Sequence, residues 1–374
     1  MDKAGRGQAG ATRAIAAAAL AIAGLAIGFS PWGDRATLVL LDAQWRALRH
    51  FEVRPAAADI VIVGIDEASA ARIAEPRGLW HEPLGKALAR IAAARPRAIG
   101  IDVQLPDRSY EGTRPGLDRA LLLGLVAARQ NGPFVATLSI DPHTRAARNI
   151  HTPFLAVLRE ERLAIGLLAR DVDGVTRRFS LALPTEDGSF PTFTGRLCKA
   201  LSAGCSDGLL DFALGPAFTY VPLQAVLEAE DLPALERRFR DRIVLVGDTM
   251  PYTGRIAVPI DPAAWESAAS DTPAIVVQAL ALRTALANAA PQEGSRPLVV
   301  VLVSLAALLA FIASPLAMAG AAIAGAAGLF AVSVFALRSG VAIPLAAPMA
   351  VLLLALAMAA WLAASKRFVI RRRA

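Results

Sequence analysis

The chain has 374 residues, of which 55% are hydrophobic and 19% are charged, a composition that excludes an ordinary soluble protein and indicates membrane segments. Its net charge of +7 lies in the two tails, because residues 1–13 sum to +2, residues 366–374 sum to +5 and the part between them is neutral. Basic residues beside apolar segments are typical of a membrane protein, whereas nucleic-acid binding needs them on a folded surface, so nucleic acid is excluded as a partner.

Four apolar segments predict membrane spans, one at the start of the chain and three at its end. The first, residues 14–31, follows the basic start and fits a membrane anchor, and a cleaved signal peptide is the open alternative. No convincing A-x-A cleavage site follows it, which favours the anchor. The other three predicted spans, joined by tight turns, are residues 297–314, 315–337 and 341–364.

The basic tails set the orientation of these spans, because Lys and Arg are enriched on the cytoplasmic side of membrane proteins. With one span before the middle region and three after it, both tails lie in the cytoplasm and the middle lies outside. A cleaved first segment would leave this result unchanged. The Ala- and Arg-rich composition suggests a bacterium, where the protein would lie in the inner membrane with its main domain periplasmic or extracellular. The predicted parts are a cytoplasmic tail (1–13), a span (14–31), an outer α/β domain (32–296), three spans (297–314, 315–337 and 341–364) and a second cytoplasmic tail (365–374).

The middle region alternates apolar runs with amphipathic helices, which predicts an α/β fold with a mainly parallel sheet and flanking helices. Residues 60–65 are apolar in succession, so we expect both faces of this strand to be covered. The first half is expected to hold helices over 37–49, 84–94 and 117–130 and strands over 60–65, 98–103 and 134–140. The second half is expected to hold a hairpin of 164–170 and 176–183 around a turn at 171–174, a helix over 193–201, a strand over 242–246 and a helix over 274–289.

The two cysteines, Cys198 and Cys205, fall in the region predicted to lie in an oxidising compartment, where a disulfide is allowed. On one continuous helix they would be about 10 Å apart, which is too far for a bridge. A helix break at Gly204 would bring them together, so a disulfide and two free thiols both stay open. No third or fourth ligand lies nearby in the sequence to support a zinc site.

Three apolar runs end on carboxylates, which are Asp66 with Glu67 after IVIVGI, Asp102 after AIGI and Asp248 after IVLVG. Ligands of open α/β sheets bind beyond the carboxyl ends of the strands, so neighbouring strands would gather these side chains into a binding site for a cation or an amine. Gathered carboxylates would raise one another's pKa. The alternative is that each aspartate caps a helix or orders a turn by itself. No glycine-rich phosphate loop follows Asp66, so a nucleotide site is not supported.

Other motifs do not support a catalytic or metal site. The turn sequence at 171–174, DVDG, matches the start of a calcium loop but lacks the third ligand and the later Glu, which leaves a plain turn. The four histidines have no metal-binding spacing, and no serine has the G-x-S-x-G setting of a hydrolase. We therefore predict no cofactor, no metal and no catalytic residues.

Six stretches together resemble the type-two CHASE domain, the extracytoplasmic sensory domain of bacterial receptors with cyclase, histidine-kinase or serine/threonine-kinase outputs. They are LLDAQWRALR, IVIVGIDEAS, AIGIDVQLPD, DVDGVTRRFSL, RIVLVGDT and IVVQALALRTAL, in this order between about Leu40 and Leu282. No single stretch is very specific, but the ordered set is. One span before the domain and three after it also match the usual layout of the family. The resemblance implies a sensory α/β domain and a homodimer, because many receptors of this kind are dimers.

The chain departs from the family pattern at several points. Members tend to carry a Trp-Pro-Trp-Pro-Arg-like segment after the first strand, where this chain has Leu79-Trp80-His81-Glu82-Pro83 without a matching Arg. An acidic residue common after the RIVLVGDT strand is replaced by Gly254 or Arg255, and a Glu and a His of the last helix are replaced by Val276 and Gln278. A ligand bound at those positions in relatives would be bound differently in this chain or not at all.

Receptors of the family continue into a catalytic output domain, whereas only residues 365–374 follow the last predicted span. We therefore predict a non-enzymatic membrane sensor or signalling protein. Its outer domain would recognise an unidentified ligand or partner, and the signal would pass to a separate effector protein in the membrane or the cytoplasm.

The effector would pack on the small-residue face of the 315–337 span, where Gly325 and Gly328 allow close approach of another helix. The basic tails would in addition contact anionic membrane lipid. Two alternatives stay open, which are an extracytoplasmic metal-dependent enzyme that uses the three aspartates and a non-catalytic membrane scaffold.

Overall fold

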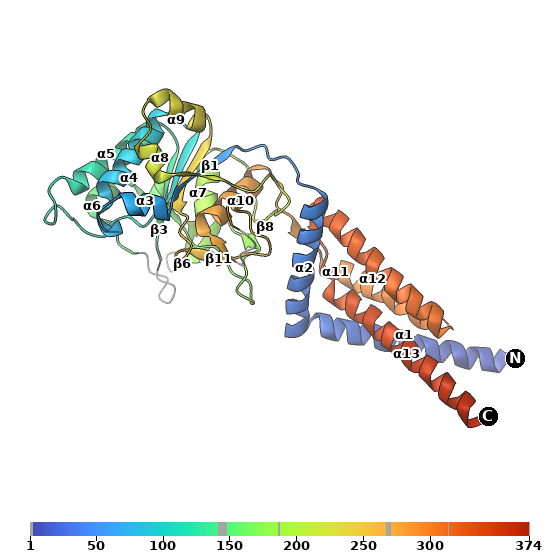
Figure 1. Cartoon of the computed structure of the whole chain (residues 1–374). Helices are drawn as coiled ribbons and strands as arrows, with labels where there is room; N and C mark the ends of the chain where they lie inside the picture. The colour runs from blue at the N-terminus through green and yellow to red at the C-terminus, as the bar shows by residue number, and fades with distance from the viewer. Residues whose placement is uncertain (1–2, 141–147, 186–187, 267–270, 313, 374) are drawn as a thin grey trace. The chain divides into compact units, whose positions relative to one another are not determined.

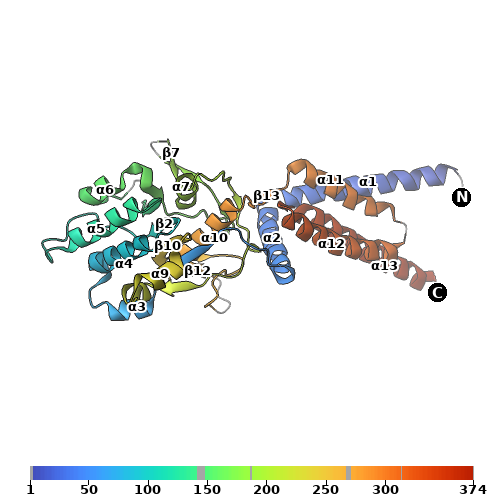
Figure 2. The same ribbon diagram turned by 90° about the horizontal axis from the view of Figure 1, so that it is seen from above.

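The computed structural model describes residues 3–140, 148–185, 188–266, 271–312 and 314–373, and it divides into two compact units (Figures 1 and 2). One unit, which we call the α/β domain, comprises Val53–Ala290. The other, which we call the helical unit, comprises Met1–Glu52 and Pro291–Ala374. Each unit has its own buried apolar cluster.

The α/β domain is built on a six-stranded sheet in which every pair of neighbouring strands is parallel. Its strands are β1 (Ile60–Ile65), β2 (Ala98–Asp102), β3 (Phe134–Leu138), β4 (Leu163–Ile165), β9 (Tyr220–Pro222) and β10 (Ile243–Asp248). Their order across the sheet is β4-β3-β2-β10-β1-β9. The strands β1 and β10 are buried at nearly every position, as expected for a parallel sheet that is covered on both faces.

Helices cover both faces of the sheet. They are α3 (Glu67–Arg72), α4 (His81–Ala93), α5 (Leu117–Gln130), α6 (Thr152–Leu158), α7 (Phe193–Ala200), α8 (Leu223–Leu227), α9 (Leu232–Phe239) and α10 (Ala274–Leu286), with the 3₁₀ turns η1 (Arg77–Leu79) and η2 (Glu160–Arg162). The helices α4, α5, α6, α8 and α9 share one apolar cluster with the strands, and α7 and α10 contact the strands separately. A side chain at Gly100 would lie 2.6 Å from the ring of Phe193 and one at Gly247 would lie 2.8 Å from Ile275, so these glycines admit α7 and α10 onto the sheet.

The prediction of a hairpin formed by residues 164–170 and 176–183 is wrong. Residues of its first arm form β4, which pairs in parallel with β3, and β5 (Arg178–Phe179) pairs antiparallel with β8 (Gly208–Leu209). Only the turn is present, where the amide of Gly174 donates to the carbonyl of Asp171 at 2.8 Å. All three residues of β4 are buried, which fits the central sheet better than an exposed hairpin. Two further small antiparallel pairs are β6 (Ala182–Thr185) with β7 (Gly188–Pro191) and β11 (Arg255–Ala257) with β12 (Asp271–Pro273).

The cysteines Cys198 and Cys205 are joined by a disulfide, and their Cα atoms lie 6.3 Å apart. The helix α7 ends at Ala200, and Ser202 has a positive φ of 53°. The chain therefore reverses at Ser202 and not at Gly204, where the sequence suggested a break.

The helical unit contains five α-helices among its described residues. They are α1 (Lys3–Gly28), α2 (Pro31–Phe51), α11 (Arg296–Ala307), α12 (Pro315–Arg338) and α13 (Ala346–Arg373), with the 3₁₀ turn η3 (Leu308–Phe311) and the paired strands β13 (Gln292–Glu293) and β14 (Val341–Ala342). The helix α1 packs closely on α13, since a Cβ at Gly24 would lie 2.2 Å from Cγ2 of Val351 and one at Gly28 would lie 2.2 Å from Cβ of Ala347. Glycines four residues apart are a common means of close helix approach in membranes.

Three helices of the described chain are long and apolar enough to cross a membrane, which are Ala11–Gly28, Pro315–Arg338 and Ala346–Ser365. At 297–314 the helical segment is shorter than the span that the sequence led us to expect. Here α11 and η3 together cover only Arg296–Phe311, fewer than the roughly 20 residues of a full span. The segment expected at 341–364 also differs at its start. Residues Val341–Ala342 pair with β13 there, and the helix begins at Ala346.

Candidate functional site

The aspartates Asp102 and Asp248 lie at the carboxyl edge of the sheet because their strands end there side by side. β10 lies between β2 and β1, with Asp102 paired to Gly247 and Asp248 paired to Ile65. The third aspartate, Asp66, follows β1 directly. The strand order therefore places all three predicted aspartates at one edge of the sheet, as the rule for open α/β sheets led us to expect.

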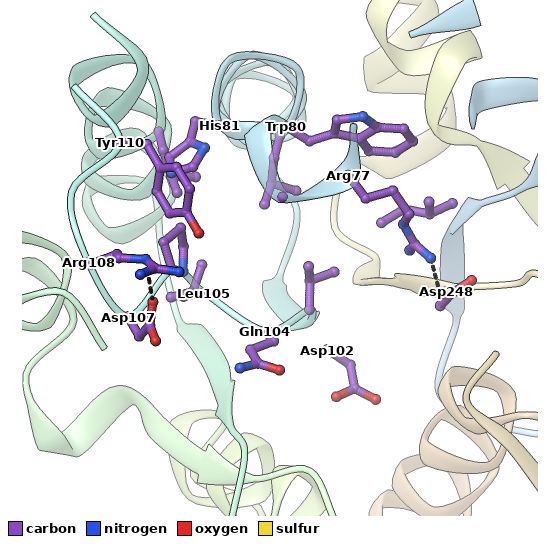
Figure 3. A pocket seen from close by; sticks show the side chains of 16 residues that line it. Arg77, Trp80, His81, Asp102, Gln104, Leu105, Asp107, Arg108, Tyr110 and Asp248 are labelled. Atoms are coloured by element: carbon purple, nitrogen blue, oxygen red, sulfur yellow. Dashed lines mark hydrogen bonds and ion pairs between the residues drawn. The ribbon is translucent and has the colours of Figure 1, made fainter. Parts of the chain in front are cut away.

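A cavity of about 520 Å³ opens at this edge, and Figure 3 shows its lining. Asp102 and Asp248 line it, whereas Asp66 and Glu67 do not. The lining consists of Ile65, Arg77, Gly78, Trp80, His81, Leu84, Asp102, Val103, Gln104, Leu105, Pro106, Asp107, Arg108, Tyr110, Leu121 and Asp248. Its size falls within the range of small-molecule sites.

Asp66 has a different setting from the other two aspartates. It caps α3 by accepting a hydrogen bond from the amide of Ser69 at 2.8 Å, and the hydroxyl of Tyr220 donates to its other oxygen at 3.1 Å. Burial and the neighbouring carboxylate raise the pKa of Tyr220 to about 12. Glu67 begins α3 and is exposed. The structure thus gives Asp66 the capping contacts that the alternative interpretation described.

Asp248 is held by three hydrogen bonds. The guanidinium of Arg77 donates to its Oδ2 at 2.8 Å, the hydroxyl of Thr253 donates to the same oxygen at 2.8 Å, and the amide of Met250 donates to Oδ1 at 2.9 Å. Arg77 lies in η1, just before the tryptophan segment in which sequence reasoning found no matching Arg. The sequence does contain a signal for Arg77, because this residue lies three positions before Trp80. In the family segment the Arg follows the tryptophan, whereas in this chain it precedes it.

Asp102 is the partly buried carboxyl group at the end of β2. Burial and the charge of Asp248 raise its pKa, a hydrogen bond with Thr137 lowers it, and the net result is a pKa of about 6. Among the described residues, no Lys or Arg forms an ion pair with Asp102. Gly166 lies against it, since a Cβ on this glycine would be 3.0 Å from Oδ1 of Asp102. The lining therefore includes a carboxyl group with a pKa of about 6 and with no cationic partner in the described chain.

One wall of the cavity is aromatic. The indole nitrogen of Trp80 donates to the carbonyl of Glu75 at 2.7 Å, which fixes the loop before α4. The buried imidazole of His81 lies 5.3 Å from the ring of Tyr110, and the guanidinium of Arg108 lies 5.8 Å from that ring. Burial lowers the pKa of His81, and Asp118, 3.5 Å from its Nε2, opposes the change. We therefore treat His81 as neutral at pH 7.

The lining of the cavity combines apolar and charged side chains, which suits a small molecule with one polar end. The described residues contain no group of three or more His, Cys, Asp and Glu side chains placed to hold a metal ion. The acidic residues of the turn at 171–174 are also engaged, because Arg177 pairs with Asp171 at 3.2 Å and with Asp173 at 2.8 Å.

These features define a class of protein: a parallel α/β domain with a cavity beyond the carboxyl ends of its strands, in a chain with apolar helices long enough to cross a membrane. The model of the CHASE2 domain matches residues 16–321, which is most of the chain. The chain therefore belongs to the CHASE2 family, a family of sensory extracytoplasmic domains, and the resemblance seen in the sequence is confirmed. No curated protein and no solved structure matches it.

Proposed function

We propose that the protein is a non-enzymatic membrane sensor whose α/β domain binds a small ligand in the cavity at the carboxyl edge of the sheet. The observation that carries this proposal is the amphiphilic cavity itself, in a chain of a sensory family, with a carboxyl group that forms no ion pair with the residues that the structure describes. A sensor domain needs a site whose occupation changes the domain, and a ligand achieves this only through different affinities for two arrangements.

We propose that the α/β domain lies outside the cytoplasm of a bacterial cell, in the periplasm or beyond. Two observations support this placement. The net charge lies in the two tails, as the positive-inside rule requires of cytoplasmic ends. The disulfide between Cys198 and Cys205 is of the kind that persists in oxidising compartments. Contact of the tails with anionic lipid would follow from the same charge.

We propose that the signal passes to a separate effector protein through the helical unit. The exposed face of α12 supports this idea, because no atom of the described residues lies within 4 Å of an added Cβ at Gly320 or Gly328. Gly325, by contrast, faces Leu352 of α13 at 3.4 Å, so it is used inside the unit. Of the two glycines predicted to form the interface, Gly325 therefore faces α13 and Gly328 faces outward. The protein would form a homodimer through the same face, since many receptors of this kind are dimers.

Affinity purification of the full-length protein from its native cells in mild detergent, followed by mass spectrometry, tests this function. We expect stoichiometric recovery of a kinase, a cyclase or another regulator. The double variant Gly320→Leu, Gly328→Leu should reduce that recovery, because the leucines fill the open face of α12. The matched control is Ala18→Leu, which adds the same side chain to an exposed position of α1. Recovery of the protein alone, at normal expression, would overturn the effector proposal.

A further inference from the structure

The cavity at the carboxyl edge has a charge pattern that points to the chemical class of its ligand. We propose that it binds a small organic monocation, a primary amine with an apolar body, whose ammonium group pairs with the carboxylate of Asp102. This inference rests on the proposed sensory function and specifies what the sensor recognises.

The formal charges of the lining leave room for one positive charge. The lining contains three aspartates and two arginines, which leaves one negative charge when all are ionised. Arg77 pairs with Asp248 at 2.8 Å, and Arg108 pairs with Asp107 at 3.8 Å. Both arginines thus already have carboxylate partners, and the uncompensated charge belongs to Asp102. A monocation would neutralise it, whereas an anion would meet a neutral or negative surface.

A divalent metal ion fits this site less well than an amine. Calcium takes six to eight oxygen ligands and magnesium needs near-octahedral oxygen geometry. Two of the three lining carboxylates are engaged by arginines, and the described residues hold no group of three metal-binding side chains. An ammonium group needs only one carboxylate and can use further acceptors such as the amide oxygen of Gln104, which also lines the cavity.

The rest of the cavity provides a place for an apolar body. Its lining includes the buried side chains of Ile65, Leu84, Leu105 and Leu121, together with Trp80, which is 7% exposed. An aromatic wall next to a carboxylate also favours cations, because the faces of aromatic rings attract positive charge. The neutral His81 adds no competing charge.

Binding of an amine at Asp102 has a proton balance that can be measured. Below about pH 6 the carboxyl group carries a proton, so an ammonium ion that pairs with the carboxylate releases one proton to solvent. Above this pH the carboxylate is already ionised and no proton is released. Affinity should therefore fall about tenfold per unit of pH below the pKa of Asp102 and stay level above it.

The groups around Asp102 include one further carboxylate, which belongs to Asp248. Asp248 faces it from β10 with its partner Arg77 from η1, Thr137 faces it from β3, and Gly166 lies against it from the segment after β4. The amide of Gln278 from α10 donates to the carbonyl of Gly166 at 2.9 Å and carries no charge. The other titratable or charged groups of the cavity are His81, Asp107, Arg108 and Tyr110.

Calorimetric titration of the full-length protein in mild detergent tests the inference with a defined set of probes. The probes are 2-phenylethylamine, its neutral isostere 2-phenylethanol, the anion 3-phenylpropionate, L-phenylalanine, and the chlorides of Ca²⁺ and Mg²⁺. At pH 7.5 we expect the amine to bind at least tenfold more tightly than the alcohol and the anion. At pH 5 the amine should bind about tenfold more weakly, with release of one proton seen as a dependence of the heat on the ionisation enthalpy of the buffer.

Variants separate the role of Asp102 from that of the cavity. Asp102→Asn should weaken the amine at least tenfold and abolish the pH dependence. Gly166→Ala, which presses on Oδ1 of Asp102, is a second variant that leaves the carboxyl group in place, and it should weaken the amine while keeping the pH dependence. Asp59→Asn, at an exposed aspartate before β1 that pairs with Arg242 and does not line the cavity, is the matched control and should bind as the wild type does.

The outcomes distinguish this inference from the function on which it rests. Tighter binding of L-phenylalanine than of the amine would overturn the monocation, because a zwitterion has no net charge and brings a carboxylate into the cavity. Binding of the alcohol, the anion or a metal ion in preference to the amines, or no binding of any probe, would overturn the inference. If a regulator is still recovered with the protein in that case, the sensory proposal stands and only the ligand class is wrong.

Discussion

The pH dependence of stability at Asp102 is a sharp test of the site, because the burial of one carboxyl group sets its sign and size. The pKa of this group rises from an ordinary value of 3.8 to about 6 in the folded protein. The native state thus holds the proton more tightly than the unfolded state does. Stability is greatest when the group is protonated, falls as pH rises from about 4 to about 6, and is level above that range.

The magnitude follows from the size of the shift. A shift of one unit corresponds to about 1.4 kcal/mol, so ionised Asp102 costs on the order of 3 kcal/mol of folding free energy above pH 6. Asp102→Asn removes this cost but also alters the hydrogen bond with Thr137, which adds an offset that does not depend on pH. The part that depends on pH isolates the charge. Between pH 4.5 and pH 8, the stability of the variant relative to the wild type should rise by about 2 kcal/mol.

Hydrogen exchange of the full-length protein in mild detergent provides the measurement, read from peptides that contain β2. Comparison of the two proteins at the same pH cancels the intrinsic pH dependence of amide exchange. Peptides from α13 serve as an internal control and should not differ between the proteins. A relative stability that stays flat, or that falls with rising pH, would refute the assignment of a buried, destabilising carboxylate to Asp102.

Three other changes give separate tests of the structure. Gly28→Leu should destabilise the helical unit by about 1–3 kcal/mol, because its side chain would overlap α13, whereas Gly328→Leu points into open space and should leave detergent thermal stability unchanged. Arg77→Gln removes the cation that neutralises Asp248, so it should raise the pKa of Asp102 further by leaving two uncompensated carboxylates, which the pH at which amine affinity falls would report. Cys205→Ser opens the small disulfide loop and should lower stability by about 2 kcal/mol, measured against the wild type with and without reductant.

Local signals predicted much of the fold. The helix over 117–130 has the predicted bounds, and the strands over 60–65 and 98–103 differ from the structure by one residue at most. Apolar runs on consecutive residues correctly indicated a sheet covered on both faces. These features depend on residues close together in the sequence, which is why the periodicity of apolar residues detects them.

The wrong hairpin shows where such signals end. A turn at 171–174 between two apolar stretches is a local pattern, and the turn is indeed formed. The strands next to the turn pair with other segments: β4 pairs with β3, and β5 pairs with β8. In each case a helix lies between the two paired strands in the sequence. A strand pairs where its side chains become buried and its backbone groups find hydrogen-bond partners. The sequence next to the turn does not show which distant segment offers such a position.

The candidate site divides in the same way. The rule on strand ends predicted the edge at which Asp102 and Asp248 line the cavity, because it needs only the direction of parallel strands. It could not separate these two residues from Asp66, since all three follow similar apolar runs. The difference comes from contacts with residues distant in sequence, Arg77 for Asp248 and Tyr220 for Asp66.

The cost of ionised Asp102 connects the ligand with the signal under the proposed function. A cation that pairs with this carboxylate offsets the free energy that burial imposes on it, so the occupied domain gains stability where β2 meets β10. Under the proposed function this gain must differ between two arrangements of the domain, because a ligand shifts their balance only through differential affinity. A site with a fully solvated carboxylate would bind the same cation with less effect on the domain, because it would have no such cost to relieve. Burial of the carboxyl group at the end of β2 therefore couples the binding of a cation to the stability of the domain.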